Sequence, residues 1–404
     1  MKLNMLKKTG LQKIIRISVL AKLSCLCIIT FLNLLANTEI AFPEKKNSEN
    51  CPKALVELKK LEMANLSVLD HRKGLENVEQ LCPSLVEGQY EFGRWYLEQG
   101  NYSEASRYFK QAENLKPRLE HALGLAKAKS MLLDFVSAET IYKEAIGKYS
   151  GHWSLLEGLG VLYLSLGKYQ DAEELFRQGL QDQSLEGSLY YNLGVALERQ
   201  NRIDEAMLSF KTALDKSPLL VQARVALIKG HFEKGEFLEA KRLGEQGMLH
   251  SPGNTELLIM QIQVLDTMNS PSEALRLVER LPDSTSRSMK SAFKAVLLLR
   301  DGEKEEVQKI FSEWFGSDQR VSADNLDVAR AYSYFLLVEK KFEKAEMILE
   351  QIIEIRPDDA SMLNNLGVAC QSLGKIDKAK DYFRKAGALL PASSVVKANQ
   401  EKIS

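Results

Sequence analysis

The sequence is poor in the residue types from which most catalytic and metal centres are built. Its 404 residues include only five cysteines and five histidines. It contains no His-Glu-x-x-His or Cys-x-x-Cys spacing, no Gly-x-x-x-x-Gly-Lys phosphate loop and no Gly-x-Ser-x-Gly nucleophile turn. The sequence therefore offers no catalytic residue, no metal ligand and no cofactor site, and it predicts a protein that is not an enzyme.

The chain also lacks an excess of charge of either sign. It holds 54 basic and 54 acidic residues, of which residues 1–41 hold six and one, so residues 42–404 carry a net charge of −5. Without a basic stripe such a protein has little to offer a phosphate backbone, and we expect no nucleic-acid partner. Long alternating apolar and polar segments are missing too, which favours an all-α chain over one with a sheet.

Residues 1–41 differ in composition from the rest. Their six basic residues precede the apolar run Leu23–Ala36. A positive start, a short apolar run and a small residue after it are typical of a secretory signal peptide. Read from residue 17, the run approaches the length of a membrane-spanning helix. A cleaved signal and an uncleaved membrane tether through residues 17–36 both stay open. Both predict an exported protein, periplasmic or otherwise extracytoplasmic.

Internal repetition is what the sequence has in abundance. The stretch YNLGVALERQNRIDEAMLSFKTALDKSP at Tyr191–Pro218 returns as NNLGVACQSLGKIDKAKDYFRKAGALLP at Asn364–Pro391. Each contains one alanine of a series whose steps are mostly 34 residues. The series is Ala105, Ala138, Ala172, Ala206, Ala240, Ala274, Ala345 and Ala379, with a weaker copy centred on Val307. The chain therefore holds about nine units.

Other positions keep the same period. Five residues before the repeat alanine, seven units have Gly or Asn: Gly100, Gly167, Asn201, Gly235, Asn269, Gly302 and Gly374. Twelve residues before it, seven units have a small residue, and four residues after it most have an aromatic one. Five prolines follow it by twelve: Pro117, Pro218, Pro252, Pro357 and Pro391. Gly or Asn ends a helix in the left-handed conformation, Pro ends the next helix, and a small residue opposite a ring lets two helices approach.

Each unit is thus interpreted as helix, tight turn, helix and proline. This pattern resembles the tetratricopeptide repeat family over Val86–Pro391, three-quarters of the chain. The resemblance implies a right-handed α-solenoid of about nine helix-turn-helix repeats at residues 86–391. Residues 392–404 are expected to be a C-terminal tail. A hinge is expected near residues 281–326, where connections are irregular and lengthened, because weak interfaces in such an array lower cooperativity.

Residues 42–85 are interpreted as a linker followed by a helical hairpin that caps the array. Cys51 and Cys82 bracket this hairpin, and antiparallel helices would bring both to the same end. An exported protein can keep a disulfide there. A pair of free thiols stays the alternative. Acid pairs on the second helices, such as Glu173 and Glu174, are expected on solvated outer faces.

The resemblance also implies that the first helices line a concave groove that holds a peptide or a partner helix. Residues at groove positions are Tyr90, Arg94, Lys127, Tyr191, Asn192, Val195, Lys229, Phe232, Gln263, Arg330, Tyr334, Asn364 and Asn365. In the middle units these positions are aromatic, apolar or basic. We therefore expect a partner segment with an apolar stripe and some acidic residues.

These observations predict a non-catalytic protein–protein interaction scaffold outside the cytoplasm. By analogy with exported proteins of this family, it would serve the assembly or targeting of an envelope or secretion complex. Two alternatives stay open: a self-associating structural protein, and an enzyme whose site is hidden in the helical array.

Overall fold

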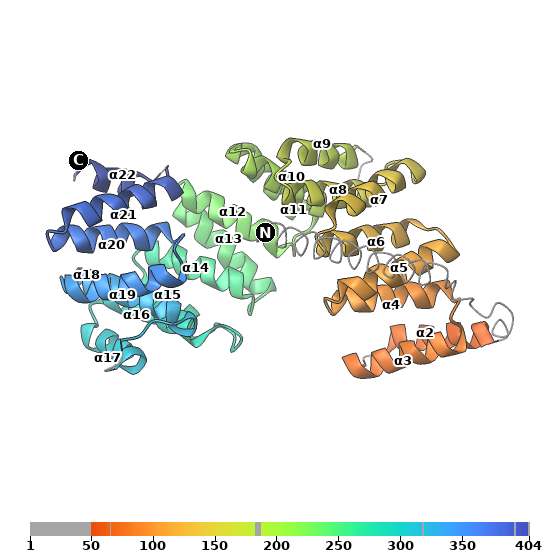
Figure 1. The fold of residues 1–404 in the computed structure, drawn as a ribbon, viewed down its shortest axis with the longest axis horizontal. Coiled ribbons are helices and arrows are strands. Elements are labelled where there is room, and N and C mark those ends of the chain that lie inside the picture. Colours follow the sequence, from red (N-terminus) through yellow and green to blue (C-terminus); the bar gives the residue numbers. More distant parts are fainter. Residues whose placement is uncertain (1–49, 65, 182–186, 317–318, 392, 403–404) are drawn as a thin grey trace, which may run out of the picture. The chain divides into compact units, whose positions relative to one another are not determined.

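The computed structural model describes residues 50–64, 66–181, 187–316, 319–391 and 393–402. The expected signal or tether at residues 1–41 lies outside these ranges. Within them no strand occurs, and no helix there is long and apolar enough to cross a membrane. The chain divides into two compact units, one ending at Ser150 and the other beginning at Gly151. Figure 1 shows the helices of both, coloured along the sequence.

The described part of the first unit consists of three helical pairs. Its helices are α2 (Cys51–Met63), α3 (Val68–Leu81), α4 (Val86–Glu98), α5 (Tyr102–Leu115), α6 (Leu119–Met131) and α7 (Phe135–Lys148). Each helix packs against the next along the chain. The pair α2/α3 is the predicted capping hairpin, and α4/α5 and α6/α7 are the first two repeats.

The second unit continues the same arrangement through seven more pairs. Its helices are α8 (Trp153–Ser165), α9 (Tyr169–Leu180), α10 (Gly187–Arg199), α11 (Ile203–Lys216), α12 (Val221–Glu233), α13 (Phe237–His250), α14 (Thr255–Thr267), α15 (Pro271–Val278), α16 (Arg287–Asp301), α17 (Lys304–Phe315), α18 (Leu326–Val338), α19 (Phe342–Ile355), α20 (Ala360–Ser372), α21 (Ile376–Leu389) and α22 (Ser394–Glu401). Here too each helix contacts the next. Within the described ranges the repeats therefore number nine, as predicted. The even-numbered helices from α4 to α20 are the first helices of the repeats, and the odd-numbered ones from α5 to α21 are the second.

The turn inside every repeat has one residue in the left-handed conformation. All seven Gly and Asn residues that the sequence marks have positive φ. The two repeats without such a residue make the same turn, with Leu133 at φ 61° and Lys340 at φ 56°. A side chain with a Cβ is strained in this region, whereas glycine is not. Leu133 is also 73% exposed, so it gains little from packing in return.

Replacement of Leu133 by glycine should therefore stabilise the protein. We expect Leu133→Gly to raise the free energy of unfolding by about 1 kcal/mol, because the backbone strain is removed and little buried surface is lost. Denaturant unfolding measures this. The neighbouring Leu132 has an ordinary φ of −79°, so Leu132→Gly should lower stability. Equal losses from both substitutions would contradict the assignment of strain to Leu133.

Prolines end the second helices as the sequence predicts. Five second helices (α5, α11, α13, α19 and α21) each stop two residues before a proline. The proline cannot supply the next backbone N–H donor and disfavours helical backbone in the residue before it. The connection to the next first helix therefore begins at a defined position in each of these repeats.

In four repeats a glycine of the first helix faces an aromatic ring of the second helix. A Cβ built on Gly160 would lie 2.4 Å from the ring of Phe176, and one on Gly194 would lie 2.4 Å from that of Phe210. Phe176 and Phe210 are almost completely buried. No Cβ fits at such a distance, so glycine is required wherever the ring takes this place.

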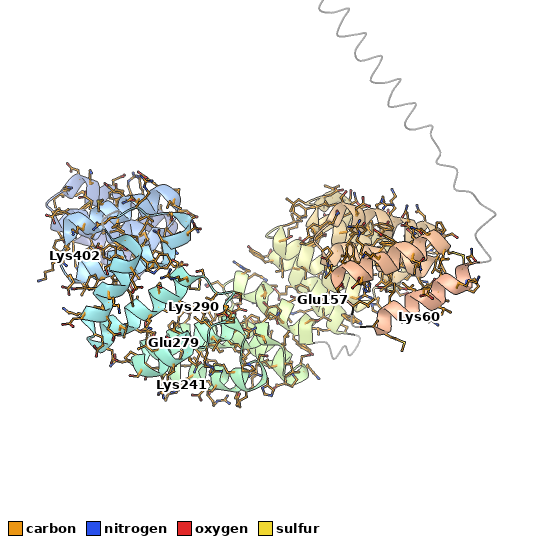
Figure 2. The ribbon with its side chains drawn as sticks, turned by 90° about the horizontal axis from the view of Figure 1, so that it is seen from below. Lys60, Glu157, Lys241, Glu279, Lys290 and Lys402 are labelled. Atoms are coloured by element: carbon orange, nitrogen blue, oxygen red, sulfur yellow. A yellow bond between two sulfur atoms is a disulfide. The ribbon has the colours of Figure 1, made fainter. Side chains whose placement is uncertain are left out.

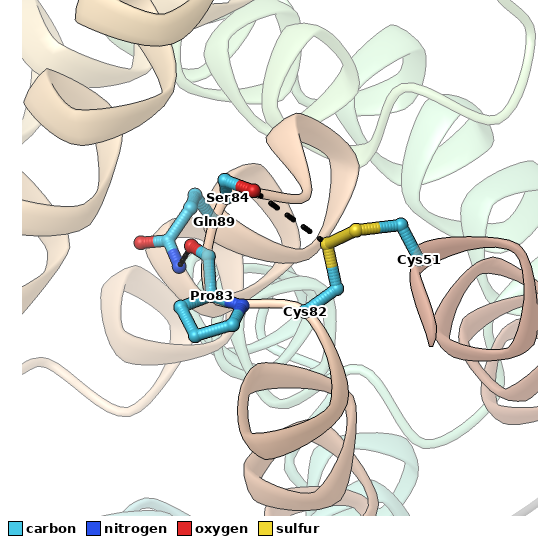
Figure 3. The surroundings of a disulfide bond; sticks show 5 residues. All are labelled: Cys51, Cys82, Pro83, Ser84 and Gln89. Carbon is cyan, nitrogen blue, oxygen red and sulfur yellow. Dashed lines mark hydrogen bonds between the residues drawn. A yellow bond between two sulfur atoms is a disulfide. The ribbon is translucent and has the colours of Figure 1, made fainter. Parts of the chain in front are cut away.

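A disulfide between Cys51 and Cys82 holds the capping hairpin together (Figure 3). Cys51 begins α2, Cys82 follows the end of α3, and their Cα atoms are 4.9 Å apart. Leu58 and Leu75 of the hairpin are buried in one cluster with Phe92 of α4. Closing a loop with a sequence separation of 31 contributes about 3–4 kcal/mol in the chain-entropy model.

Thiol counting tests this disulfide. In a form that begins after residue 41, Cys370 is the remaining thiol; it is fully buried, and burial together with Glu346 raises its pKa to about 11. We expect no thiol labelling of the folded protein at pH 8, one thiol per chain in denaturant, and three after reduction. Three thiols in denaturant without reductant would remove the disulfide.

The irregular segment at residues 281–326 begins where α15 ends early. This helix has 8 residues, whereas the other second helices have 12–14. A 3₁₀ turn, η2 (Ala323–Asn325), lies in the long connection before α18, and α16 packs directly against α18. The rings of Phe311 and Phe315 of α17 lie 4.8 and 4.9 Å from that of Tyr332. A hinge in this segment stays a prediction.

The C-terminal residues, expected as a tail, include the helix α22. Its Val396 is buried against Leu363 and Ala386. The Gln400 Nε2 atom donates a hydrogen bond to the carbonyl oxygen of Phe383 at 2.8 Å. The helix therefore covers the end of the last repeat, as the hairpin α2/α3 covers the first.

Candidate functional site

Five of the thirteen candidate residues come together on α10 and α12. They are Tyr191, Asn192, Val195, Lys229 and Phe232. Spacings of three and four residues place Tyr191 with Val195 on one face of α10, and Lys229 with Phe232 on one face of α12. An ion pair of 3.0 Å between Lys229 Nζ and Glu198 Oε1 links the two helices. We call Tyr191, Val195, Lys229 and Phe232 the α10–α12 surface.

The aromatic side chains of this surface are half-buried. The ring of Tyr191 lies 5.7 Å from that of Phe210, and the ring of Phe232 lies 5.4 Å from that of Phe237. Burial raises the pKa of Tyr191, and Glu256 of α14 raises it further. Each ring thus has one side fixed by packing, which is the arrangement of an aromatic anchor that can bind a partner at low entropic cost.

Charge on the α10–α12 surface is more balanced than the sequence suggests. Lys229 pairs with Glu198 and lies 3.9 Å from Glu233, and the carboxylate of Glu256 acts on Tyr191. The expectation of acidic residues in the partner rested on basic positions such as Lys229; it stays a prediction, but Lys229 gives it little support because it already pairs with Glu198. The surface suits an apolar segment with neutral hydrogen-bonding groups.

Two candidates lie beside this surface: Asn192, already named, on α10, and Gln263 on the next first helix, α14. Asn192 Nδ2 donates to Glu157 Oε1 of α8 at 2.9 Å; Glu157 is labelled in Figure 2. Gln263 is exposed on α14. The amide of Asn192 therefore links two repeats, and Gln263 is exposed to solvent.

Four other candidates lie on α18 and α20. Arg330 Nη2 lies 2.6 Å from Asp359 Oδ2, and Tyr334 is 46% exposed. Asn365 is half-buried, but Asn364 is only 8% exposed and its Oδ1 accepts a hydrogen bond from Asn399 of α22. Asn364 was expected in the groove; it instead holds the terminal helix, whose presence the sequence analysis did not predict.

The remaining three candidates lie in the first unit. The ring of Tyr90 packs 5.3 Å from His121 and 5.8 Å from Phe109. Arg94 pairs with Glu91 of its own helix at 3.1 Å. Lys127 is exposed on α6. This group offers fewer apolar contacts to a partner than the α10–α12 surface does.

Some acids of the second helices are buried rather than solvated. Glu173 is 5% exposed and pairs with Arg177 at 2.7 Å and with Arg202 of the next repeat at 2.8 Å. Glu346 occupies the same repeat position, is 7% exposed and pairs with Lys375 of the next repeat. The expectation that Glu173 lies on a solvated face was wrong, because its partner comes from another repeat.

Substitution of Glu173 should destabilise the array. Glu173→Lys would put a third cation beside two arginines, and we expect a loss of about 3 kcal/mol in the free energy of unfolding. The adjacent Glu174 is exposed, so Glu174→Lys should change stability by less than about 0.5 kcal/mol. Thermal and denaturant unfolding compare the two variants. Similar stability of both would show that the buried pair does not hold the repeats together.

A cleft elsewhere on the second unit is lined by none of the thirteen candidate residues. This cleft of about 730 Å³ opens beside α12, and its lining includes Leu208 of α11, Arg224 of α12 and Leu243 of α13. In the sequence, Arg224 could have indicated this cleft, because it is a charged residue at a repeat position that is mostly apolar. For metals, no cluster of three or more His, Cys, Asp or Glu side chains occurs among the described residues.

Four segments of the chain match family models. Residues 86–119 and 360–386 match one model described as a tetratricopeptide repeat, and residues 123–185 and 158–220 match a second. Together with the nine helical pairs, these matches define a helical-repeat solenoid. The chain belongs to the tetratricopeptide repeat proteins.

Individual relatives are distant. The human protein O-mannosyl-transferase TMTC1 is 24% identical over 258 residues, which cover 62% of this chain and 25% of that protein. The chain thus spans about a quarter of the length of this curated relative. The Cut9-Hcn1 hetero-tetramer of the APC/C is 12% identical, with 92% of this chain and 66% of that chain covered and a TM-score of 0.51; this likeness shows the fold alone. Yeast Tom70 is 14% identical, with coverage of 87% and 88% and a TM-score of 0.49.

Proposed function

We propose that the protein is a non-catalytic scaffold that binds a polypeptide segment on the α10–α12 surface. The observation that carries the proposal is a half-buried ring on each of two first helices, Tyr191 on α10 and Phe232 on α12, which the Lys229–Glu198 ion pair links. Rings held on one side by packing lose little freedom when a partner covers the other side.

The chemistry of the surface favours an apolar stripe in the partner. The contacts available are the faces of Tyr191 and Phe232 and the methyl groups of Val195. The ion pair between Lys229 and Glu198 can accept and donate hydrogen bonds at the rim without favouring either sign of charge. A partner helix or extended segment with apolar side chains at alternate or helical spacing fits this description.

Export is part of the proposal. The basic and apolar pattern of residues 1–41 supports a secretory signal or a membrane tether through residues 17–36. The Cys51–Cys82 disulfide supports it independently, since disulfides persist mainly in oxidising compartments. A role in assembling or targeting an envelope or secretion complex follows by analogy with exported proteins of the family.

Capture experiments test the binding site. Tyr191→Ala with Lys229→Ala should weaken capture of the native partner at least about a hundredfold, because a central aromatic anchor usually dominates binding and the loss of Lys229 also removes hydrogen bonds at the rim. Helical content by circular dichroism and the melting temperature should change little, which separates lost binding from lost folding.

A matched control lies on a second helix. Leu389 and Lys380 of α21 are both exposed, so Leu389→Ala with Lys380→Ala removes a large apolar side chain and a lysine from a second helix. Capture should survive this change. Loss of capture with the α21 pair and not with the α10–α12 pair would refute the proposed site. Light scattering that showed assembly of the chain with itself, and capture of no other protein, would favour a structural role instead.

A further inference from the structure

A second surface, separate from the α10–α12 surface, surrounds Arg224. It is the cleft of about 730 Å³ between the second helices α11 and α13, with α12 contributing the third side. Arg224, Leu227 and His231 line it, at spacings of three and four residues along α12. Lys229 and Phe232 lie on a different face of the same helix. A partner in the cleft would therefore not compete for the α10–α12 surface.

Arg224 is a buried cation. Its residue is 8% exposed, and its Nη2 donates a hydrogen bond to the carbonyl oxygen of Pro218 at 2.8 Å. Within the described part of the chain no carboxylate forms an ion pair with the guanidinium. Burial, and then the neighbouring Arg242, lower its pKa. Binding of an anion stabilises a buried, unpaired guanidinium, because the anion replaces the hydration that the group lost on burial.

The fold makes room for this side chain. A Cβ on Gly247 of α13 would lie 2.6 Å from Arg224 Cδ. The same repeat position is alanine in four other repeats: Ala112, Ala145, Ala213 and Ala386. The absence of a methyl group in α13 thus lets the arginine pass between α12 and α13.

The positive charge is not needed for the hydrogen bond that Arg224 makes. Gln89 occupies the same repeat position in the first repeat and donates to the carbonyl oxygen of Pro83 at 2.9 Å (Figure 3). A neutral side chain therefore does the same structural task in this very chain. The other seven repeats have residues without charge there: Ala122, Leu156, Tyr190, Leu258, Ser291, Ala329 and Leu363. The charge of Arg224 is left without a structural role.

The rest of the cleft combines apolar walls with further cations. Met207, Leu208 and Leu214 come from α11, and Leu208 is 66% exposed. Lys211 and Arg242 lie on opposite walls; Arg242 Nε donates to Glu239 Oε2 at 2.8 Å. Asp215 is the other acid in the lining.

A second cleft of about 660 Å³ adjoins the first along the start of α13. The two share Glu239 and Arg242, and the second continues past Leu238, which is 77% exposed, to Met268. Two adjoining clefts with apolar walls exceed what a single inorganic anion would fill. They suit a length of polypeptide with apolar side chains on both sides of an acidic one.

We propose that the cleft between α11 and α13 binds a partner-protein segment in which an Asp or Glu carboxylate pairs with Arg224 and flanking apolar side chains contact Met207, Leu208 and Leu243. The site lies on the second helices and does not depend on the function proposed for the first helices.

A displayed library of random 12-residue peptides, selected on the full chain, tests this proposal. Enriched peptides should contain Asp or Glu next to Leu, Ile, Met or Phe. Binding of the synthesised peptides should fall at least about tenfold on Arg224→Gln, since a desolvated charge pair is lost. The variant copies the Gln89 arrangement, so its melting temperature should stay close to that of the wild type.

Replacement of the peptide's acid by its amide should cause the same loss, with no further loss when both changes are combined. Leu208→Ser, at an exposed rim position, should also weaken binding, whereas Tyr191→Ala should not. If Arg224→Gln fails to fold, the Leu208→Ser variant and the peptide with an amide in place of its acid still decide the outcome.

Four results would overturn the proposal. Enriched peptides could lack acids, or they could bind the Arg224→Gln protein equally well. Tyr191→Ala could abolish their binding, or 50 mM inorganic phosphate could displace them completely.

Discussion

The contact between a glycine of the first helix and an aromatic ring of the second sets the distance between the two helices in four of the repeats. At Gly160, Gly194 and Gly367 the ring lies where a Cβ would otherwise be, closer than any Cβ contact allows. The pair of helices can therefore approach only with glycine at that position. Once the pair is fixed, its remaining apolar surface must be covered by the next pair, because a single hairpin cannot bury both of its faces. The capping helices α2/α3 and α22 cover the apolar surface of the first and the last repeat.

Ion pairs between repeats add specificity to this apolar stacking. Glu173 and Glu346 are buried at the same repeat position, and each pairs with a basic residue that immediately precedes the second helix of the next repeat. Such pairs contribute little net stability when exposed, but loss of one partner leaves a buried charge, which is costly. They favour one register of adjacent repeats over others. Arg224 differs from these buried charges, because no carboxylate within the described ranges pairs with it.

Much of the fold could be predicted from sequence because its determinants are local and periodic. The left-handed turn occurs in all nine described repeats, the proline helix end in five and the glycine–aromatic contact in four, each at its own position of the repeat. Even the turns at Leu133 and Lys340, which lack the favoured residue, follow the period, because neighbouring helices impose the geometry. The helix α22 was missed because it lies outside the repeat and has no periodic signal.

The candidate site was harder to predict because it depends on pairs between repeats. The spacing placed Tyr191 and Lys229 on first helices, but it could not show that Glu198 neutralises Lys229 or that Asn399 binds Asn364. The period identifies which residues share a face, whereas the partner of each side chain depends on the relative rotation of two helices that are distant in sequence.

Site-specific photo-cross-linking tests the central claim most directly. A photoreactive amino acid at position 195, on the first helix α10, is compared with one at position 389, on the second helix α21, in the full chain within its native compartment. We expect position 195 to cross-link to a distinct partner protein and position 389 not to do so. Cross-links to that partner from position 389 alone, or equally from both positions, would contradict it.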